Sequence, residues 1–311
     1  MRDRWLMSLA LGLALALAVT GCAGKARKLS QYDLALYLQQ QGKGDDALQA
    51  LQRSLALDPE DPTPREALAA GYYERGWRTQ AVQEWEKAWE KSSEDPSFYV
   101  GEGKPLRSQA WISDGVEAHK RAAAGLVRCY TAIADEAFKG ARFEDAAKAA
   151  KRLTELAPDA LPGWLTLARS LKKLKDGEGG YAAWMRCAEM DPKDADISKE
   201  LGFAAFGLTK LNEAETAFRR YTALKPDDPK GYNNQGTILA LLDRFEESQA
   251  AFDKALTLQK DMIPSLNGKA TAYYYQKKYD EARKVWAHVL ELAPDDPTAL
   301  ENIRTLVKMG Y

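Results

Sequence analysis

Two consecutive segments, residues 229–262 and 263–296, constrain this chain more than any other feature. They show the same order of residue types at an offset of 34 residues. In each segment a small residue occupies the eighth place and another occupies the twentieth: Gly236 and Ser248, then Ala270 and Ala282. Small residues at these places let two antiparallel helices approach closely, while the bulky residues between them fill the gaps between successive helix pairs. The period therefore predicts stacked helical hairpins.

The same stride of 34 residues places further copies along the chain. Working back from Pro294 in steps of 34 reaches Pro226, Pro192 and Pro158, with Lys260 as the one departure, and Pro59 places an earlier copy in the same way. Proline cannot continue a helix, so it marks the end of the second helix of each copy. Seven copies result, and no large residue stands at the eighth or the twentieth place in any of them: 28–61, 62–95, 127–160, 161–194, 195–228, 229–262 and 263–296.

The period and the residue order resemble the tetratricopeptide repeat (TPR) family. The resemblance implies an all-α fold, a right-handed TPR superhelix (α-solenoid) of about seven helical hairpins. The first copy is weak, with Gln31 at a place that is normally large, and we interpret it as an N-terminal cap. Residues 297–311 contain a C-terminal capping helix, because Leu300, Ile303 and Leu306 with Val307 follow helical spacing. Gly177, Gly179 and Gly180 predict a looser hairpin in the copy that begins at residue 161.

An insertion at residues 96–126 interrupts the period between TPR 1–2 (28–95) and TPR 3–7 (127–296). Its first part, rich in Gly and Pro, predicts a loop, and a helix is expected from about Ser113 to Lys139. Two interpretations stay open. The loop contacts the groove or a partner through Phe98, Tyr99 and Trp111, or the insertion is a spacer that packs on its neighbours.

The N-terminus predicts export and lipid attachment. Residues 1–21 combine Arg2 and Arg4 with a short apolar run, as a secretory signal peptide does. The last residues before and at the cleavage point, Val-Thr-Gly-Cys, resemble the lipobox of bacterial lipoproteins. That resemblance implies acylation of Cys22, and Ala23 after it favours the outer membrane. A plain signal peptide is the alternative. Residues 22–30 then form a short basic tether.

Composition argues against several functions. The formal net charge of −1, from 44 basic and 45 acidic residues, gives no reason to expect nucleic acid as a partner. His119 and His288 are the only histidines, and Cys129 and Cys187 lie in different copies, so neither a metal site nor a disulfide is expected. We predict no cofactor and no catalytic residue, and hence no enzyme.

Binding of proteins is the remaining function. In the TPR family the first helix of each hairpin lines a concave groove, and its second, fifth, ninth, twelfth and thirteenth places face a partner. At these places the chain carries basic, aromatic and amide side chains, which suit acidic or extended peptide segments. The candidate groove residues are Arg169, Lys172, Lys199, Phe203, Phe206, Asn233, Asn267, Tyr274 and Tyr275.

The arrangement of signal, lipobox and repeats resembles TPR lipoproteins of the bacterial envelope, such as pilotins of type IV pilus secretins and adaptors of cell-wall hydrolases. The resemblance implies a non-catalytic, lipid-anchored scaffold at the periplasmic face of the outer membrane. Its partners would be other proteins, and it would aid assembly of a pilus, secretion or motility machine. An adaptor that recruits peptidoglycan or polysaccharide enzymes is the alternative, and fold alone does not separate the two.

Overall fold

The computed structural model describes residues 30–95, 98 and 109–311. Within these ranges the regular structure is helical and contains no strand, which confirms the all-α prediction. The chain divides into two compact units, residues 1–133 and 134–311, and each is described by itself. The predicted signal peptide and Cys22 lie outside the described residues.

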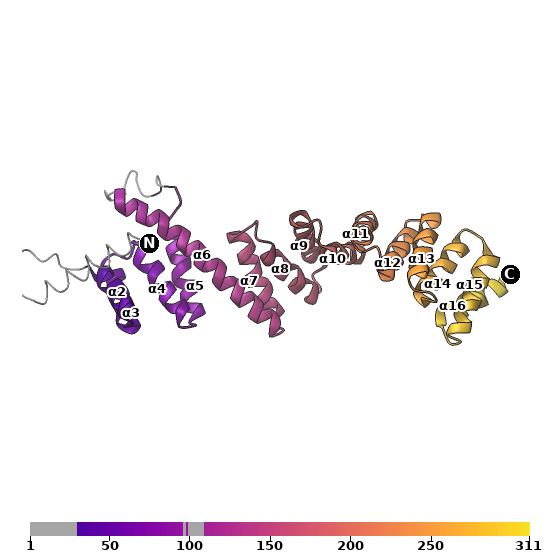
Figure 1. Ribbon diagram of the computed structural model, residues 1–311, viewed down its shortest axis with the longest axis horizontal. Coiled ribbons are helices and arrows are strands. Elements are labelled where there is room, and N and C mark those ends of the chain that lie inside the picture. Colours follow the sequence, from indigo (N-terminus) through magenta and orange to yellow (C-terminus); the bar gives the residue numbers. More distant parts are fainter. Residues whose placement is uncertain (1–29, 96–97, 99–108) are drawn as a thin grey trace, which may run out of the picture. The chain divides into compact units, whose positions relative to one another are not determined.

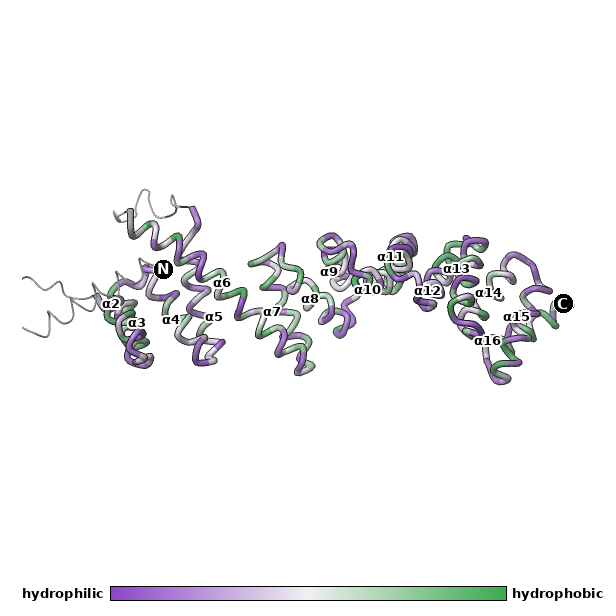
Figure 2. Tube along the Cα trace, in the orientation of Figure 1, coloured by the Kyte–Doolittle hydropathy of each residue, from purple (hydrophilic) through white to green (hydrophobic). Residues whose placement is uncertain are grey.

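The first unit is built from two helical hairpins and a long fifth helix, all labelled in Figure 1. In chain order the helices are α2 (Gln31–Gln40), α3 (Gly44–Leu57), α4 (Pro62–Glu74), α5 (Arg78–Glu90) and α6 (Gln109–Lys139), whose end from Ala134 onward belongs to the second unit. Apolar and polar stretches alternate along these helices in Figure 2, as expected when one face is buried.

The second unit continues with hairpins and ends in a single helix. Its helices are α7 (Phe143–Leu156), α8 (Leu161–Lys173), α9 (Gly177–Met190), α10 (Ala195–Gly207), α11 (Leu211–Leu224), α12 (Pro229–Leu241), α13 (Phe245–Leu258), α14 (Ile263–Tyr275), α15 (Tyr279–Leu292) and α16 (Pro297–Lys308). The five helices that begin at residues 161, 195, 229, 263 and 62 each have 13 residues. They are called A helices here, together with α2 and the part of α6 from residue 127 to Lys139, and the helix that follows each is its B helix.

Several of the described helices, α10 and α12 among them, start after a residue whose side chain caps them. Asp194 accepts a hydrogen bond from the backbone N–H of Ile197, and Asp228 accepts one from Lys230. Such side-chain acceptors satisfy N–H groups that the first helical turn leaves unpaired. Pro229 occupies the first turn of α12, where the missing N–H costs nothing.

The turn between the A and B helices places one residue in the left-handed region in every hairpin. Gly42 and Gly76 take this place in the first unit, at φ of 73° and 76°. In the second unit the same place is held by residues with side chains: Ala141, Lys175, Thr209, Asp243 and Lys277, all at φ between 56° and 62°. A residue with a Cβ is disfavoured there, and a β-branched one such as Thr209 most of all.

Several of the small residues at the eighth and twentieth places lie in close contact between A and B helices, as predicted. A Cβ added to Gly202 would lie 2.9 Å from the Phe218 ring, and one added to Gly236 would lie 2.9 Å from Phe252. Ser248, at a twentieth place, donates a hydrogen bond to the carbonyl oxygen of Gly236 over 2.8 Å. Ala168 is fully buried as well. Small residues at these places therefore set the spacing of the hairpins.

The described part of the insertion packs on its own unit. α6 begins at Gln109, earlier than Ser113, and runs without a break to Lys139. A Cβ on Gly125 would lie 2.3 Å from the Trp85 ring, so α6 and α5 meet closely at this point. His119 stacks on Trp89, with ring centroids 5.6 Å apart. For residues 109–126 these contacts support the spacer interpretation.

The aromatic residues of the insertion are described only in part. Phe98 is 39% exposed. Tyr99 and the side chain of Trp111 lie outside the described residues, so the loop interpretation stays a prediction for them.

Two details of the second unit differ from expectation. α9 begins at Gly177 and has 14 residues, like α11 and α13, so the predicted loosening is absent from the helix bounds. The carboxylate of Asp176 accepts a hydrogen bond from the Gly179 N–H and so caps this glycine-rich start. In α16, Leu306 is fully buried against α15, but Val307 is 59% exposed and belongs to the outer face.

Candidate protein-binding grooves

A groove lies between the A helices α8 and α10 of the second unit. Two adjoining pockets of about 350 and 190 Å³ form it, and they share Lys172, Trp184 and Glu200. We call it the α8–α10 groove. Further residues that line it are Phe138, Leu165, Arg169, Lys173, Lys175, Asp176, Gly177, Gly180, Asp194, Asp196, Ile197, Phe203, Ala204 and Gly207. It thus contains Arg169, Lys172 and Phe203 of the predicted set.

The carboxylates of this groove are already engaged. Glu200 pairs with Lys172, and Asp196 accepts a hydrogen bond from Lys199 over 2.6 Å. That hydrogen bond lowers the pKa of Asp196 below its ordinary value. Asp194 caps α10 through the N–H of Ile197. The carboxylates of the wall are therefore engaged by Lys172, by Lys199 or by a helix terminus. Asp196 also interacts electrostatically with Arg169, but no ion pair joins the two.

Three cations of the groove have no such partner among the described residues, and two of them, Arg169 and Lys173, lie on α8. Arg169 and Lys173 are exposed and form no ion pair among the described residues. They come from successive turns of one helix, so both face the same side. An incoming carboxylate could pair with them without displacing an existing bridge.

An aromatic side chain completes the wall. Phe203 is 42% exposed and meets the buried Phe218 ring edge-on, with centroids 5.1 Å apart. Phe206 is 40% exposed but does not line the groove. Lys199 also lies outside it, with its ammonium 5.7 Å from the centre of the Tyr221 ring. Phe203 therefore offers a fixed apolar surface beside the free cations.

The predicted asparagines connect successive repeats. Asn233 accepts a hydrogen bond from Ser265 of α14 over 2.9 Å. Asn267 donates one to Asp296, which also caps α16, over 3.2 Å. Their amides are thus partly committed to the packing of A helices.

The predicted tyrosines of α14 differ from each other. Tyr275 is 62% exposed and stacks on Phe245, with ring centroids 5.8 Å apart. Tyr274 is half-buried against Trp286 and Tyr279. Its hydroxyl lies 3.7 Å from the sulfur of Met309. Tyr275 is the more accessible of the two, and Tyr274 belongs mainly to the core of the last hairpin.

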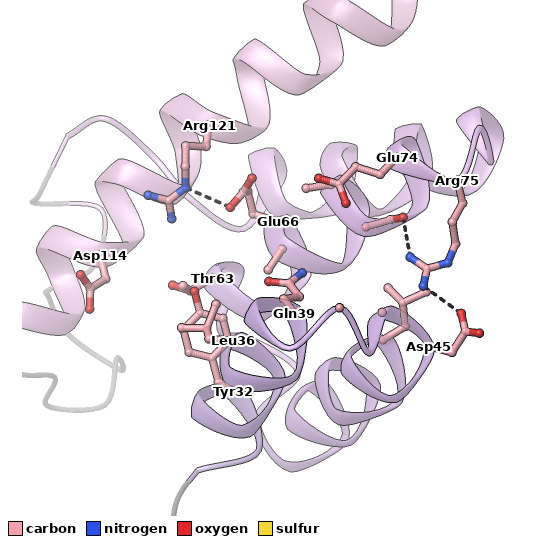
Figure 3. Close-up of a pocket in the computed structure, with 16 residues that line it drawn as sticks. Tyr32, Leu36, Gln39, Asp45, Thr63, Glu66, Glu74, Arg75, Asp114 and Arg121 are labelled. Atoms are coloured by element: carbon pink, nitrogen blue, oxygen red, sulfur yellow. Dashed lines mark hydrogen bonds and ion pairs between the residues drawn. The ribbon is translucent and has the colours of Figure 1, made fainter. Parts of the chain in front are cut away.

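A larger groove, of about 950 Å³, lies in the first unit and was not predicted. We call it the α2–α4–α6 groove after three of the helices that line it (Figure 3). Its lining residues are Tyr32, Leu36, Gln39, Gly42, Gly44, Asp45, Leu48, Thr63, Glu66, Ala67, Ala70, Gly71, Glu74, Arg75, Asp114 and Arg121. The sequence did contain a signal, because Tyr32, Leu36 and Gln39 hold the fifth, ninth and twelfth places of the first repeat. Because we interpreted that repeat as an N-terminal cap, we did not consider these three residues as candidates for a groove.

The thiols and imidazoles do not form a reactive centre in the described ranges. Cys129 and Cys187 are free and buried, and burial raises their pKa values to about 11 and 12. Buried thiols of this kind are chemically inert. The ring of His119 forms a hydrogen bond with Ser92 over 3.0 Å. Among residues 30–95, 98 and 109–311 no cluster of His, Cys, Asp and Glu could hold a metal ion.

Comparison with known proteins agrees with the helical repeats. Residues 32–96, 199–263 and 264–296 match models of the tetratricopeptide repeat, and these ranges together exceed half of the chain. The fold and its grooves define an all-α repeat solenoid for protein interaction. The chain belongs to the tetratricopeptide repeat family, whose members bind other proteins or peptides and are generally non-catalytic scaffolds.

Two curated relatives carry the same name. The chain is 28% identical over 193 residues to Hsp70-Hsp90 organizing protein 1 of Arabidopsis thaliana, which covers 61% of this chain and 28% of that protein. It is 31% identical over 185 residues to Hsp70-Hsp90 organizing protein 1 of Glycine max, covering 59% and 27%. The chain thus spans about a quarter of the length of these relatives.

Solved structures show the same fold. The crystal structure of MamA protein matches with a TM-score of 0.50 and 20% identity, over 54% of this chain and 92% of that one. The structure of YrrB, a TPR protein with an unusual peptide-binding site, matches with a TM-score of 0.54 and 15% identity, over 62% and 97%. No helix of the described ranges is both long and apolar enough to span a bilayer.

Proposed function

We propose that this chain is a lipid-anchored, non-catalytic adaptor that holds an acidic, extended segment of an envelope protein in its α8–α10 groove. The observation that carries the proposal is the pair Arg169 and Lys173, two exposed cations that form no ion pair among the described residues, beside the exposed ring of Phe203. Charged hydrogen bonds to a carboxylate and apolar contact with the ring would act together.

The proposed place of action is the periplasmic face of the outer membrane. The lipobox-like sequence that ends in Cys22 supports it, because acyl chains at that residue would anchor the protein to a membrane. The role is to aid assembly of a pilus, secretion or motility machine. Recruitment of peptidoglycan or polysaccharide enzymes is the alternative role of the same groove.

Capture of partners from membranes tests the groove. The full chain with Arg169→Glu and Lys173→Glu should lose its bound partners, whereas wild type retains them. A matched control reverses two exposed charges elsewhere, with Arg283→Glu and Lys148→Glu, and should retain them. Identification of the partners by mass spectrometry separates machine subunits from cell-wall enzymes. Equal capture by both charge-reversed variants would contradict the groove assignment.

Membrane attachment is tested separately. Cys22→Ala should move the protein from the membrane fraction to the soluble fraction and abolish its labelling by radioactive palmitate. A membrane fraction unchanged by Cys22→Ala would contradict the lipid anchor without bearing on the groove.

A further inference from the structure

The α2–α4–α6 groove has an excess of negative charge. Four carboxylates line it, from Asp45, Glu66, Glu74 and Asp114, against the two guanidinium groups of Arg75 and Arg121. Neither the α8–α10 groove nor the proposed lipid anchor has a part in this site. It is therefore a separate surface with its own charge.

Both guanidinium groups are held by the walls. Arg75 pairs with Asp45 over 2.8 Å and also donates to the carbonyl oxygen of Gly71 over 3.2 Å. Arg121 pairs with Glu66 over 2.9 Å and so ties α6 to α4. Figure 3 draws these contacts as dashed lines. No cation of the groove is left to receive an anionic ligand.

Two carboxylates remain without an ion-pair partner among the described residues. Glu74 is exposed at the end of α4, and Asp114 is exposed on α6. Asp114 and Arg121 are two turns apart on α6, and both project toward the groove in Figure 3. The inserted helix thus adds a free carboxylate to a surface that the repeats alone would not form.

The walls between the charges are apolar or aromatic. Tyr32 and Leu36 come from one face of α2, and Leu48 comes from α3. Lysine and arginine carry long aliphatic stems that can lie along such a surface while their charged ends reach a carboxylate. The groove thus offers contacts for both parts of a basic side chain.

We infer that the α2–α4–α6 groove binds an extended segment of a partner protein rich in lysine and arginine. Charge complementarity selects the class of ligand, since Glu74 and Asp114 can each receive a cation while every cation of the wall is paired. The volume of about 950 Å³ admits several side chains of an extended segment. An acidic segment would be repelled by the carboxylates of Glu74 and Asp114, with no unpaired cation of the wall to offset the repulsion.

The chain has a basic segment of its own that competes for this assignment. Lys25, Arg27 and Lys28 precede Ser30, the N-cap of α2. The experiment therefore includes a variant in which these three residues are replaced by alanine. This variant distinguishes binding of a partner's basic segment from binding of the chain's own basic tether.

Fluorescence anisotropy of a labelled peptide tests the inference. The probe is a fluorescein-labelled peptide in which Lys and Arg alternate with Ala, and its twin carries Glu at every basic position. The full chain, in detergent and at low salt, should bind the basic probe and not the acidic twin at this groove. Glu74→Gln with Asp114→Asn should weaken binding of the basic probe about tenfold, and raising the salt should weaken it further.

The control variant neutralises two exposed carboxylates elsewhere, with Asp159→Asn and Glu301→Gln, and should bind the basic probe as wild type does. Arg169→Glu with Lys173→Glu should also leave the basic probe bound. The experiment can therefore fail for the α2–α4–α6 groove independently of whether the proposed function of the α8–α10 groove holds. Equal loss in the control and groove variants would overturn the inference. Binding that appears only after Lys25, Arg27 and Lys28 are replaced would overturn it in favour of the chain's own tether.

Discussion

The two grooves differ in size and charge although the same kind of helix lines them. The α2–α4–α6 groove has about 950 Å³ and two carboxylates without an ion-pair partner among the described residues, Glu74 and Asp114. The α8–α10 groove is smaller, and its cations without an ion-pair partner in the described ranges include Arg169 and Lys173. The packing residues of a repeat set the spacing of its helices, whereas the remaining places determine which ligand it suits. One inserted helix can therefore change a groove while the hairpins beneath it stay the same.

The first prediction tests whether the packing of the two units is equivalent. Trp85 and Phe218 are the large buried side chains of one hairpin in each unit, both less than 2% exposed. Trp85→Ala and Phe218→Ala should each lower the free energy of unfolding by about 3–5 kcal/mol, measured by urea denaturation, because each leaves a cavity. Among the described residues the indole N–H of Trp85 has no hydrogen-bond partner, so the change removes packing and the contact of the ring with the Arg128 guanidinium, 5.9 Å from its centre. A loss below about 1 kcal/mol in one unit would show that the units do not share one packing scheme.

The second prediction addresses the helix that distinguishes the first unit. Gly125→Ala should lower the free energy of unfolding by about 1–3 kcal/mol, since its new Cβ would overlap the Trp85 ring. Combining it with Trp85→Leu should cost less than the sum of the two single changes, because the smaller side chain makes room. Strict additivity in urea denaturation would mean that α6 and α5 do not meet as described.

The third prediction compares the turns. Thr209→Gly should raise the free energy of unfolding by about 1 kcal/mol, because glycine tolerates the left-handed backbone at this place. Gly76→Ala should lower it by a similar amount, as no atom lies within 4 Å of the added Cβ and only the backbone resists. Thermal denaturation of the two variants checks both signs. Two changes of equal sign would contradict the account.

The smallest predicted effect depends on pH. Hydrogen bonds with Glu291 and Asp261 raise the pKa of His288 above its ordinary value. The stabilisation is therefore complete below the ordinary histidine pKa of about 6.5 and disappears as the pH rises through the folded-state value. Because the side chain of His288 is 43% exposed and so screened by solvent, the difference between His288→Gln and wild type should be about 0.5 kcal/mol at most. Urea denaturation at acidic and alkaline pH measures it, and an equal difference at both would refute it.

The helix contacts that could be predicted from the sequence are those at positions fixed by the 34-residue period. Gly202 and Gly236 pack against their B helices because the stride alone specifies which faces meet. The ion pairs were not predictable in this way. Glu66 and Arg121 lie far apart in the chain, and the insertion that brings them together has no repeat pattern.

The candidate groove residues illustrate the same limit. Arg169 and Phe203 line a groove as expected from their places in the repeat. Asn233 also occupies a position of the repeat that is expected to face the groove, but its side chain accepts a hydrogen bond from Ser265 of the next A helix. The hydrogen-bond partner of such a side chain belongs to the neighbouring repeat. It therefore cannot be predicted from the residue's position within its own repeat.

A crossed binding measurement tests most directly whether the two grooves are separate sites of opposite charge. The basic and acidic fluorescent peptides are titrated into wild type, into Glu74→Gln with Asp114→Asn, and into Arg169→Glu with Lys173→Glu. We predict that the first variant loses about tenfold in affinity for the basic peptide only, and the second loses as much for the acidic peptide only. Parallel loss of both peptides in either variant, or no loss in both, would contradict the account.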